Sequence, residues 1–369
     1  MKASERAEPV ERTGRDNGPD RARRRPDVLR GAVTAADGIL VVDKPQGLTS
    51  HDVVGATRRL AATRKVGHAG TLDPMATGLL LLGIGRATRF LTYLVGADKT
   101  YEATVRLGVE TTTEDADGEI VAARGCQPSD LPEGRLREAL TTLTGPIQQV
   151  PSAVSAIKVD GVRAYQRVRD GQDVELQARP VTIHELRLTA EPRKAIVEAA
   201  LSDGPDVVEA VDIDILVSCS SGTYVRALAR DLGRALGCGA HLTALRRTAV
   251  GPFDIDEAHT LADLSAQVEA DASAPKPHGV TTVPLEEVAR RCFEQLALSQ
   301  DEARALRYGR PLDAAVLKRV EAPDTRRPQA SPGAAEQRVV AGFAPGGRLV
   351  ALLKHQGPRA RPVLVLDPA

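Results

Sequence analysis

A run of mostly apolar residues, GLLLLGI at 78–84, most restricts how this chain can fold. An apolar run of this length between turn residues is typical of a strand buried on both faces. The segment KVGHAGTLDPMAT at 65–77 comes directly before it and places a carboxylate, Asp73, at the border of the buried strand. A carboxylate beside a dry core needs a partner, because burial disfavours its charge. The sequence therefore predicts a sheet with an acidic group at its edge.

Strand and helix patterns alternate irregularly along the rest of the chain, without a repeated strand–helix–strand unit. This irregular order predicts an α+β fold with a mixed sheet. Asp73-Pro74 fits a helix start, with Asp at the cap and Pro in the first turn. The other expected elements are strands at 39–42 and 99–109, helices at 50–65 (Ser50 as N-cap), 87–97 and 131–145, a hairpin at 155–165, and strand, loop and helix at 211–237.

Composition divides the chain into four parts. Residues 1–37 are rich in Arg, Asp, Glu and Pro and poor in large apolar residues, which predicts a disordered tail. An ordered domain is expected at 38–264, with 192–210 as an acidic loop insertion. A stretch rich in Ala, Asp, Ser and Pro at 265–282 is expected to be a linker. Residues 283–369 hold one helix pattern and several short β-like runs, which predict a small β-rich domain.

Charge and cysteine usage exclude several classes of protein. The chain has 49 basic and 49 acidic residues, which excludes a wholly basic coat protein but not an RNA partner. The four cysteines are scattered, which favours a reduced, cytoplasmic protein over a disulfide framework. No apolar run is long enough to span a bilayer. The histidines form no cluster and no nucleotide-binding motif is complete, so neither a metal nor a cofactor is expected.

Four residues are candidates for chemistry, although each also has an ordinary structural explanation. Asp73 could act as nucleophile or base if an arginine held it, or it could only cap a helix. Arg226 follows the polar loop at 220–223, so it could pair with that carboxylate or lie on a helix surface. Tyr101 could be a half-buried strand residue, and His68 a loop residue bonded to backbone. Taken singly, these signals do not decide the function.

Six sequence blocks follow one another between about residues 38 and 253: DKPQGLTSHDVV, KVGHAGTLDPMATGLLLLGIGRATR, DKTYEATVRLG, SAIKVDGVRAYQRVRDG, SSGTYVRALARDLG and GAHLTALRRTAVGPF. In this order they resemble the bacterial tRNA pseudouridine-55 synthases, the TruB family of pseudouridine synthases. GHAGTLDPMATG is highly specific by itself. The resemblance implies a catalytic domain with a central mixed, mostly antiparallel sheet flanked by helices. It also implies a small β-rich, PUA-like RNA-binding domain at the C-terminus.

The resemblance implies three catalytic residues. Asp73 corresponds to the family's catalytic aspartate, and Arg226 to the arginine that pairs with it. Tyr101 corresponds to the tyrosine that stacks on the target uracil and can take the C5 proton. Whether Asp73 attacks C1' of the ribose or removes a sugar proton stays open.

The resemblance also implies residues that bind RNA. His68 would insert into the RNA loop where the flipped base had stacked, because an aromatic ring can replace the lost stacking. Tyr224 would lie against the bound nucleotide, Leu245 would line the uridine pocket, and Lys44, together with Pro45, would shape the site. A basic surface that contacts phosphates is expected from Arg58, Arg59, Arg64, Lys65, Arg246 and Arg247.

The implied reaction converts uridine 55 in the tRNA T-loop to pseudouridine by base flipping, cleavage of the C1'–N1 bond and reattachment through C5. It requires no cofactor, metal or guide RNA, and a monomer acting on the T-arm is expected. Two alternatives stay open: a tRNA-folding chaperone without catalysis, or a pseudouridine synthase for another RNA, such as the guide-dependent rRNA enzymes. The chain departs from the family's PPxYSAxK block, because Ser152 and Val154 replace its second Pro and its Tyr.

Overall fold

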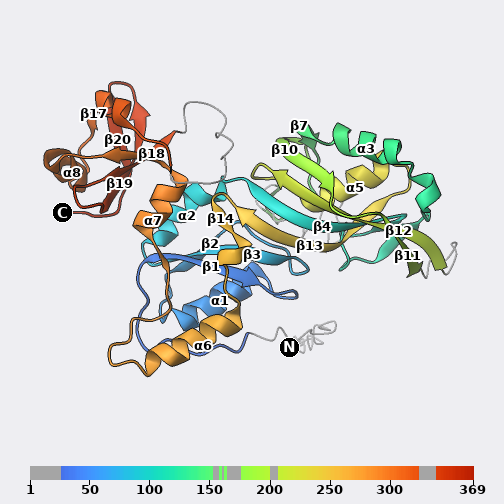
Figure 1. The fold of residues 1–369 in the computed structure, drawn as a ribbon, viewed down its shortest axis with the longest axis horizontal. Helices are drawn as coiled ribbons and strands as arrows, with labels where there is room; N and C mark the ends of the chain where they lie inside the picture. The colour runs from blue at the N-terminus through green and yellow to red at the C-terminus, as the bar shows by residue number, and fades with distance from the viewer. Residues whose placement is uncertain (1–25, 153–157, 160–161, 164–175, 200–206, 324–337) are drawn as a thin grey trace, which may run out of the picture.

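The computed structural model describes residues 26–152, 158–159, 162–163, 176–199, 207–323 and 338–369. Its main feature is a mixed sheet of 11 strands within these residues, ordered β15-β1-β3-β13-β4-β12-β10-β7, with β2, β11 and β14 paired at the sides (Figure 1). The pairing is antiparallel except between β3 and β13, which run parallel. The predicted α+β fold with a mixed, mostly antiparallel sheet is confirmed.

The strands of this sheet are β1 (Gly38–Lys44), β2 (Val66–Ala69), β3 (Thr77–Ile84), β4 (Lys99–Leu107), β7 (Gly145–Gln149), β10 (Arg179–Leu188), β11 (Arg193–Glu198), β12 (Val207–Cys219), β13 (Ala240–Val250), β14 (Phe253–Asp254) and β15 (Val283–Pro284). The helices around it are α1 (Ser50–Leu60), α2 (Ala87–Val95), α3 (Glu133–Thr142), α5 (Val225–Ala235), α6 (Leu261–Ala272) and α7 (Leu285–Cys292). Two short strand pairs form separate two-stranded sheets, β5 (Val109–Thr111) with β6 (Ile120–Ala123) and β8 (Lys158–Val159) with β9 (Val162–Arg163).

Strand β3 is buried on both faces, as its apolar run predicts. Leu79 and Leu81 pack into one core cluster with α2, and Leu80 and Leu82 pack into another with α1 and α6. Successive side chains of a strand point to opposite faces, so an unbroken apolar run suits a strand that is covered on both sides. In Figure 1, α1 and α6 lie side by side under this half of the sheet.

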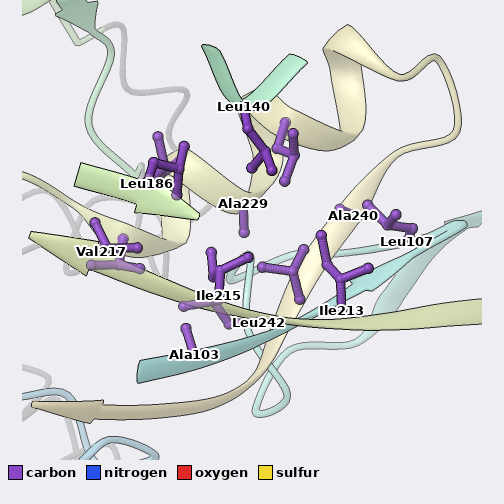
Figure 2. Close-up of a cluster of buried hydrophobic side chains, with 14 of the residues drawn as sticks. Ala103, Leu107, Leu140, Leu186, Ile213, Ile215, Val217, Ala229, Ala240 and Leu242 are labelled. Carbon is purple, nitrogen blue, oxygen red and sulfur yellow. The ribbon is translucent and has the colours of Figure 1, made fainter. Parts of the chain in front are cut away.

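A third core cluster lies where α3 and α5 cover the other half of the sheet. Figure 2 shows Ile213 and Ile215 of β12 and Leu242 of β13 gathered with Ala229 of α5 and Leu140 of α3. Strand β12 alternates buried and half-buried residues over most of its length, as expected for a strand with one covered face. This cluster fixes α5, and with it the side chains at the start of that helix.

The C-terminal part forms a second sheet of five strands, ordered β16-β18-β19-β20-β17. Its elements are β16 (Glu294–Ala297), α8 (Gln300–Arg307), β17 (Leu312–Asp313), β18 (Val339–Phe343), β19 (Leu349–Gln356) and β20 (Arg359–Val365). Phe343 and Leu352 of this sheet share a core cluster with Phe90 of α2 and with Phe293. The Phe90 and Phe293 rings meet edge to face, with centroids 5.3 Å apart. The expected helix and β-like runs of this region are confirmed.

The hairpin predicted at 155–165 lies partly outside the described residues. Within them, Lys158 pairs antiparallel with Arg163, and Val159 with Val162. The expected turn at Asp160-Gly161 is not among the described residues. No helix in the described part of the chain is long and apolar enough to cross a membrane.

Two local predictions near the start of the sheet are wrong. Thr49, not Ser50, caps α1, since its hydroxyl accepts from the backbone N–H of Asp52 while the Asp52 carboxylate accepts from the Thr49 N–H. No helix begins at Asp73-Pro74, because the chain bends there and enters β3 at Thr77. Met75 and Ala76 are buried in the core at this bend, so packing outweighs the local helix signal.

Three expectations based on composition also need correction. Residues 26–37, assigned to the disordered tail, pack on the domain: Val28 is 3% exposed, and its carbonyl accepts from Arg59 Nε. Much of the predicted acidic loop at 192–210 is strand, because Arg193–Glu198 pairs with β12. The predicted linker begins inside α6, which Thr260 and Asp263 start with a capping box. Residues 1–25 lie outside the described part.

Candidate active site

A pocket of about 280 Å³ opens on the face of the main sheet where β4 and β13 lie side by side. Its floor comes from residues at alternate positions of β4 and β13, since Tyr101 pairs with Arg247 and Ala103 with Leu245 across the two strands. The loop at 70–73 and the start of α5 form its walls. The lining residues are Gly70, Thr71, Leu72, Asp73, Val95, Lys99, Tyr101, Ser221, Gly222, Thr223, Tyr224, Val225, Arg226, Leu245 and Arg247.

Asp73 stands on this pocket because both neighbouring residues are held in place. The buried Ser50 hydroxyl bonds both the N–H of Leu72, at 2.9 Å, and its carbonyl, at 3.2 Å. The fully buried Lys44 ammonium donates to the carbonyls of Pro74 (3.3 Å), Pro45 (3.0 Å) and Leu48 (2.6 Å). The Asp73 side chain keeps 39% exposure between these anchors.

Arg226 meets Asp73 from the opposite wall of the pocket. Its Nε lies 3.0 Å from Asp73 Oδ2 and 3.6 Å from Oδ2 of the buried Asp115. The side chain is 6% exposed and lies in the first turn of α5, where the helix dipole disfavours a cation. Two carboxylates on one guanidinium offset this cost. The structure thus brings Asp73 and Arg226 to ion-pair distance, the arrangement that the resemblance implies.

Further contacts fix the guanidinium from behind. Nη1 of Arg226 donates to the carbonyl of Thr113 at 2.9 Å and to the Ser152 hydroxyl at 3.2 Å. Ser152 occupies the position of the family's second Pro, which has no side-chain acceptor. Asp115 accepts at Oδ1 from the Thr113 hydroxyl, at 2.5 Å, and from the N–H of Asp117. The segment between β5 and β6 therefore holds Arg226 in place.

Tyr101 lies on the pocket floor, nearly enclosed by protein. Burial raises the pKa of its hydroxyl above the ordinary range, although the hydrogen bond to Arg247 opposes the shift. The phenol therefore stays protonated at neutral pH. Tyr101 can present its ring to the pocket, but its phenolate form is disfavoured.

Tyr224 and Leu245 also line this pocket, as expected. Gln149, which is buried, fixes the chain at Tyr224: its side-chain oxygen accepts from the Tyr224 N–H at 2.9 Å, and its Nε2 donates to the Tyr224 carbonyl at 3.1 Å. The side chain of Gln149, at the end of β7, thus fixes the backbone at the start of α5. Sequence spacing gives no hint of this contact, because the two residues are 75 positions apart.

His68 and Lys44 do not line the pocket. His68 lies on β2, half-buried, with its ring edge-to-face against His51 at a centroid distance of 5.7 Å. Burial and the neighbouring His51 lower the pKa of His68, so the ring is neutral at pH 7. Lys44 lies behind the loop of Asp73, and burial lowers its pKa to about 8. Both residues flank the pocket.

Sequence reasoning did not place Lys99 and Arg247 on the pocket or Asp115 beside Arg226. The alternation in KTYEATV carried a usable signal, because it places Lys99 and Tyr101 on the same strand face. Arg247 was expected on a basic surface, but it is 1% exposed, donating from Nε to the Leu79 carbonyl at 2.7 Å and from Nη2 to that of Gly70 at 3.1 Å. That prediction is wrong, because β13 turns Arg247 toward the pocket.

The other residues of the expected basic surface differ in exposure. Arg246 is half-buried and forms a two-pronged ion pair with Asp43, at 2.7 and 3.1 Å. The remaining four are exposed at the end of α1 and in the turn after it: Arg58, Arg59, Arg64 and Lys65. No group of three or more His, Cys, Asp or Glu that could hold a metal ion occurs among the described residues.

Comparisons with known proteins fit this geometry. Residues 58–225 match the family model for the TruB family pseudouridylate synthase N-terminal domain. Residues 226–290 match the tRNA pseudouridylate synthase B C-terminal domain, and 293–367 match the tRNA pseudouridine synthase II C-terminal model. A curated relative from Arthrobacter sp. (strain FB24) is 51% identical over 333 residues, covering 90% of this chain and 97% of the relative. This chain belongs to the TruB family.

Other TruB relatives are similar along most of their length. The Arthrobacter protein and one from Thermobifida fusca (strain YX) are both named tRNA pseudouridine synthase B; the latter is 46% identical, covering 89% of this chain and 98% of its own. A solved structure titled "Structure of H/ACA RNP bound to a substrate RNA containing 2'-deoxyuridine" matches with a TM-score of 0.61. At 24% identity, covering 90% of this chain and 85% of that one, it supports the fold alone.

Proposed function

We propose that this chain converts uridine 55 in the T-loop of tRNA to pseudouridine. The observation that carries this proposal is the ion pair of Asp73 and Arg226 on a pocket whose floor presents Tyr101. A carboxylate facing a phosphate-rich ligand lowers affinity, so a protein that only binds RNA gains nothing from it. The names of the TruB relatives support the same activity.

The reaction moves one glycosidic bond. The C1'–N1 bond breaks with its electron pair on uracil, while Asp73 either bonds to C1' or takes a sugar proton. The uracil turns in the pocket, C5 bonds to C1', the C5 proton leaves and N1 gains a proton. Atoms and charge balance without an external reagent. The task of Arg226 is to hold the Asp73 carboxylate toward the sugar, since orientation of a reacting group lowers the barrier.

The floor of the pocket suits the detached base. Tyr101 offers a ring for stacking, and Leu245 contributes an apolar wall. A floor of buried side chains keeps water away from the sugar during the reaction. Water that reached C1' would hydrolyse the activated sugar before the uracil could rejoin it. The raised pKa of Tyr101 supports stacking as its role and disfavours its action as a phenolate base.

The target uridine must leave the RNA stack before it can reach Asp73, at a cost of a few kcal/mol. His68 flanks the pocket as a neutral ring, which suits insertion into the space the base leaves. The exposed cations Arg58, Arg59, Arg64 and Lys65 suit contact with the phosphate backbone. We infer that tRNA is the partner, bound through its T-arm by a monomer in the cytoplasm.

The C-terminal sheet is the proposed second RNA contact. We infer a PUA-like domain at 283–369 after a catalytic domain at 38–264, with 265–282 joining them. Helix α6 runs across the first of these boundaries, so the joining segment is helical at its start. RNA binding by this sheet stays a prediction.

The deciding experiment is tritium release from a T-arm RNA that carries C5-labelled uridine, with wild type and Asp73→Ala compared. Release by wild type alone, from the T-loop uridine only, supports the enzyme and the role of Asp73 together. RNA binding without release by either protein would instead support the chaperone alternative. Release only when a guide RNA is added would support a synthase for another RNA.

A further inference from the structure

Two buried cations lie on the pocket floor without an Asp or Glu of the described residues at ion-pair distance. Lys99 is 7% exposed and Arg247 is 1% exposed, and both line the pocket. Within the described part of the chain, neither lies at ion-pair distance from an Asp or Glu. Both side chains come close to Gly70, where an added Cβ would lie 3.6 Å from Lys99 Cε and 3.5 Å from Arg247 Nη1. The pocket therefore gathers positive charge beside Tyr101.

Backbone carbonyls use only part of the donor capacity of these cations. Lys99 Nζ donates to the carbonyls of Val95 (2.8 Å) and Ala97 (2.6 Å), two of the three bonds an ammonium can donate. The first carbonyl ends α2, so a cation there also suits the helix dipole. A neutral donor could satisfy these carbonyls, whereas a buried charge without a counter-ion is costly. The cost is consistent with the lowered pKa of Lys99, about 8.

The position of the cations decides which anion they suit. Ser221, Gly222 and Val95 stand at the open side of the pocket and are partly or largely exposed. The RNA backbone must stay on that side, whereas the base alone enters toward Tyr101. Arg247 hydrogen-bonds Tyr101 on the floor, whereas Lys99 Nζ bonds the Val95 carbonyl nearer the open side. A base that lies on Tyr101 therefore meets this pair of cations, and an ionised base is the anion that we assign to them.

We propose that Lys99 and Arg247 stabilise the negative charge that develops on uracil when its bond to the sugar breaks. This inference rests on the proposed function and assigns a task that Asp73, Tyr101 and Arg226 do not perform. The C1'–N1 electron pair passes to the uracil ring and spreads over its oxygens, and both cations line the pocket that would hold this ring. When C5 bonds to C1', the ring loses its C5 proton, gains one at N1 and is neutral again. Prearranged charge of this kind lowers the barrier without reorganisation.

The test compares leaving groups of different basicity. Uridine and 5-fluorouridine are placed at the T-loop target of the same RNA, and consumption of the nucleoside is followed in single turnovers. Fluorine stabilises the detached anion, so the second substrate depends less on the protein. Lys99→Gln removes the charge but keeps a donor for the end of α2, and Lys99→Arg keeps the charge. Lys194→Gln is the matched control, because it removes one positive charge from an exposed position of strand β11, away from the pocket lining.

Lys99→Gln is expected to slow uridine consumption about 100-fold and 5-fluorouridine consumption about tenfold. Lys99→Arg is expected to stay within about tenfold of wild type. RNA binding of both variants should stay close to wild type. Lys99→Gln should unfold at a temperature equal to or above that of wild type, because it removes a buried charge. Lys194→Gln should match wild type on both substrates. The proposal would be overturned if Lys99→Gln slowed consumption of the two substrates by the same factor, or if it consumed both at the wild-type rate. Lys99 would then only cap the end of α2.

A second measurement uses wild type alone and tests the proposal even if Lys99→Gln does not fold. Inhibition by free 5-fluorouracil should strengthen about tenfold as the pH rises toward the ionisation of that base, because the floor prefers the anion. It should weaken again above about pH 8, where Lys99 loses its proton. Inhibition that is absent, or that does not change with pH, would contradict the proposal. Failure of the proposed function is distinct, because wild type would then consume neither nucleoside.

Discussion

Arg226 Nε lies 3.0 Å from Asp73 Oδ2, although the two side chains differ widely in exposure, at 6% and 39%. The buried partner is the fixed one, held by Asp115, Thr113 and Ser152. The exposed carboxylate is thus positioned by a cation that cannot easily move. This asymmetry suits a group that must meet a substrate in the pocket.

Replacement of Arg226 by lysine should abolish most of the activity while the charge is kept. A lysine cannot contact Asp73, the Thr113 carbonyl and the Ser152 hydroxyl at once, because it lacks the planar fork. We expect the single-turnover rate to fall about 1000-fold, with RNA affinity within about threefold of wild type. Filter binding and tritium release measure the two quantities. A rate within tenfold of wild type would show that charge alone suffices.

Asp115→Asn should reduce catalysis without loss of RNA binding. The substitution keeps the size of the side chain but leaves Arg226 in the first turn of α5 with one carboxylate fewer. A guanidinium drawn more strongly toward Asp73 shifts that carboxylate, and we expect a rate loss of about 100-fold. Glu114→Gln, which removes a nearby carboxylate bonded to Arg230 instead, is the control and should cost under tenfold. Equal effects of the two substitutions would contradict a specific role for Asp115.

Gly78→Ala should strongly destabilise the fold. Gly78 has φ of +99°, and a Cβ there would lie 2.3 Å from the backbone oxygen of Arg247, on the strand that pairs with it. We expect a loss of about 3 kcal/mol or more in the free energy of unfolding, measured by urea denaturation. Gly55→Ala, inside α1 with nothing within 4 Å, should instead stabilise by about 0.5–1 kcal/mol. An unchanged midpoint for Gly78→Ala would show that β3 and β13 can separate.

The stability of the protein should depend on pH through Lys99. Burial lowers its pKa from 10.5 to about 8, so between these values the unfolded chain binds more protons than the folded one. The free energy of unfolding of wild type, relative to Lys99→Gln, should therefore increase as pH rises from 8 to 10. Urea denaturation of both proteins at pH 7.5, 8.5 and 9.5 measures this difference. A difference that stays constant would mean that Lys99 keeps an ordinary pKa.

The sequence pointed to the principal pair of the site because residue types and order carry that information. Asp73 at the end of a polar stretch before an apolar run and Arg226 after a small-residue loop were identifiable before any geometry was known. Asp115 was not, because it becomes meaningful only when the segment after β5 folds back on α5. Ser152 was noticed only as a departure from the family pattern, and its bond to Arg226 gives it a role.

The local errors have a common physical cause. Asp73-Pro74 carries a strong helix signal, yet packing of Met75 and Ala76 turns the chain into a strand. Likewise, Arg246 and Arg247 look alike in sequence, but strand alternation sends one to Asp43 and the other to the pocket floor. Tertiary packing therefore decided the elements that short-range patterns assigned wrongly.

Helix α2 and the C-terminal sheet share one core cluster, so the packing of α2 cannot be completed until the C-terminal sheet has been synthesised. Helix α2 ends at Val95, on the pocket, while its Phe90 is covered by Phe293 and Phe343, which the ribosome delivers much later. The strand β1 likewise waits for β15 to pair with its outer edge. A nascent chain can thus form the parts of the pocket on β4, α5 and β13 before the wall at α2 is packed. The wall beside α2 gains this packing only after Phe293 and Phe343 have emerged, so we expect the newly made chain to bind a substrate firmly only once its C-terminal sheet has folded.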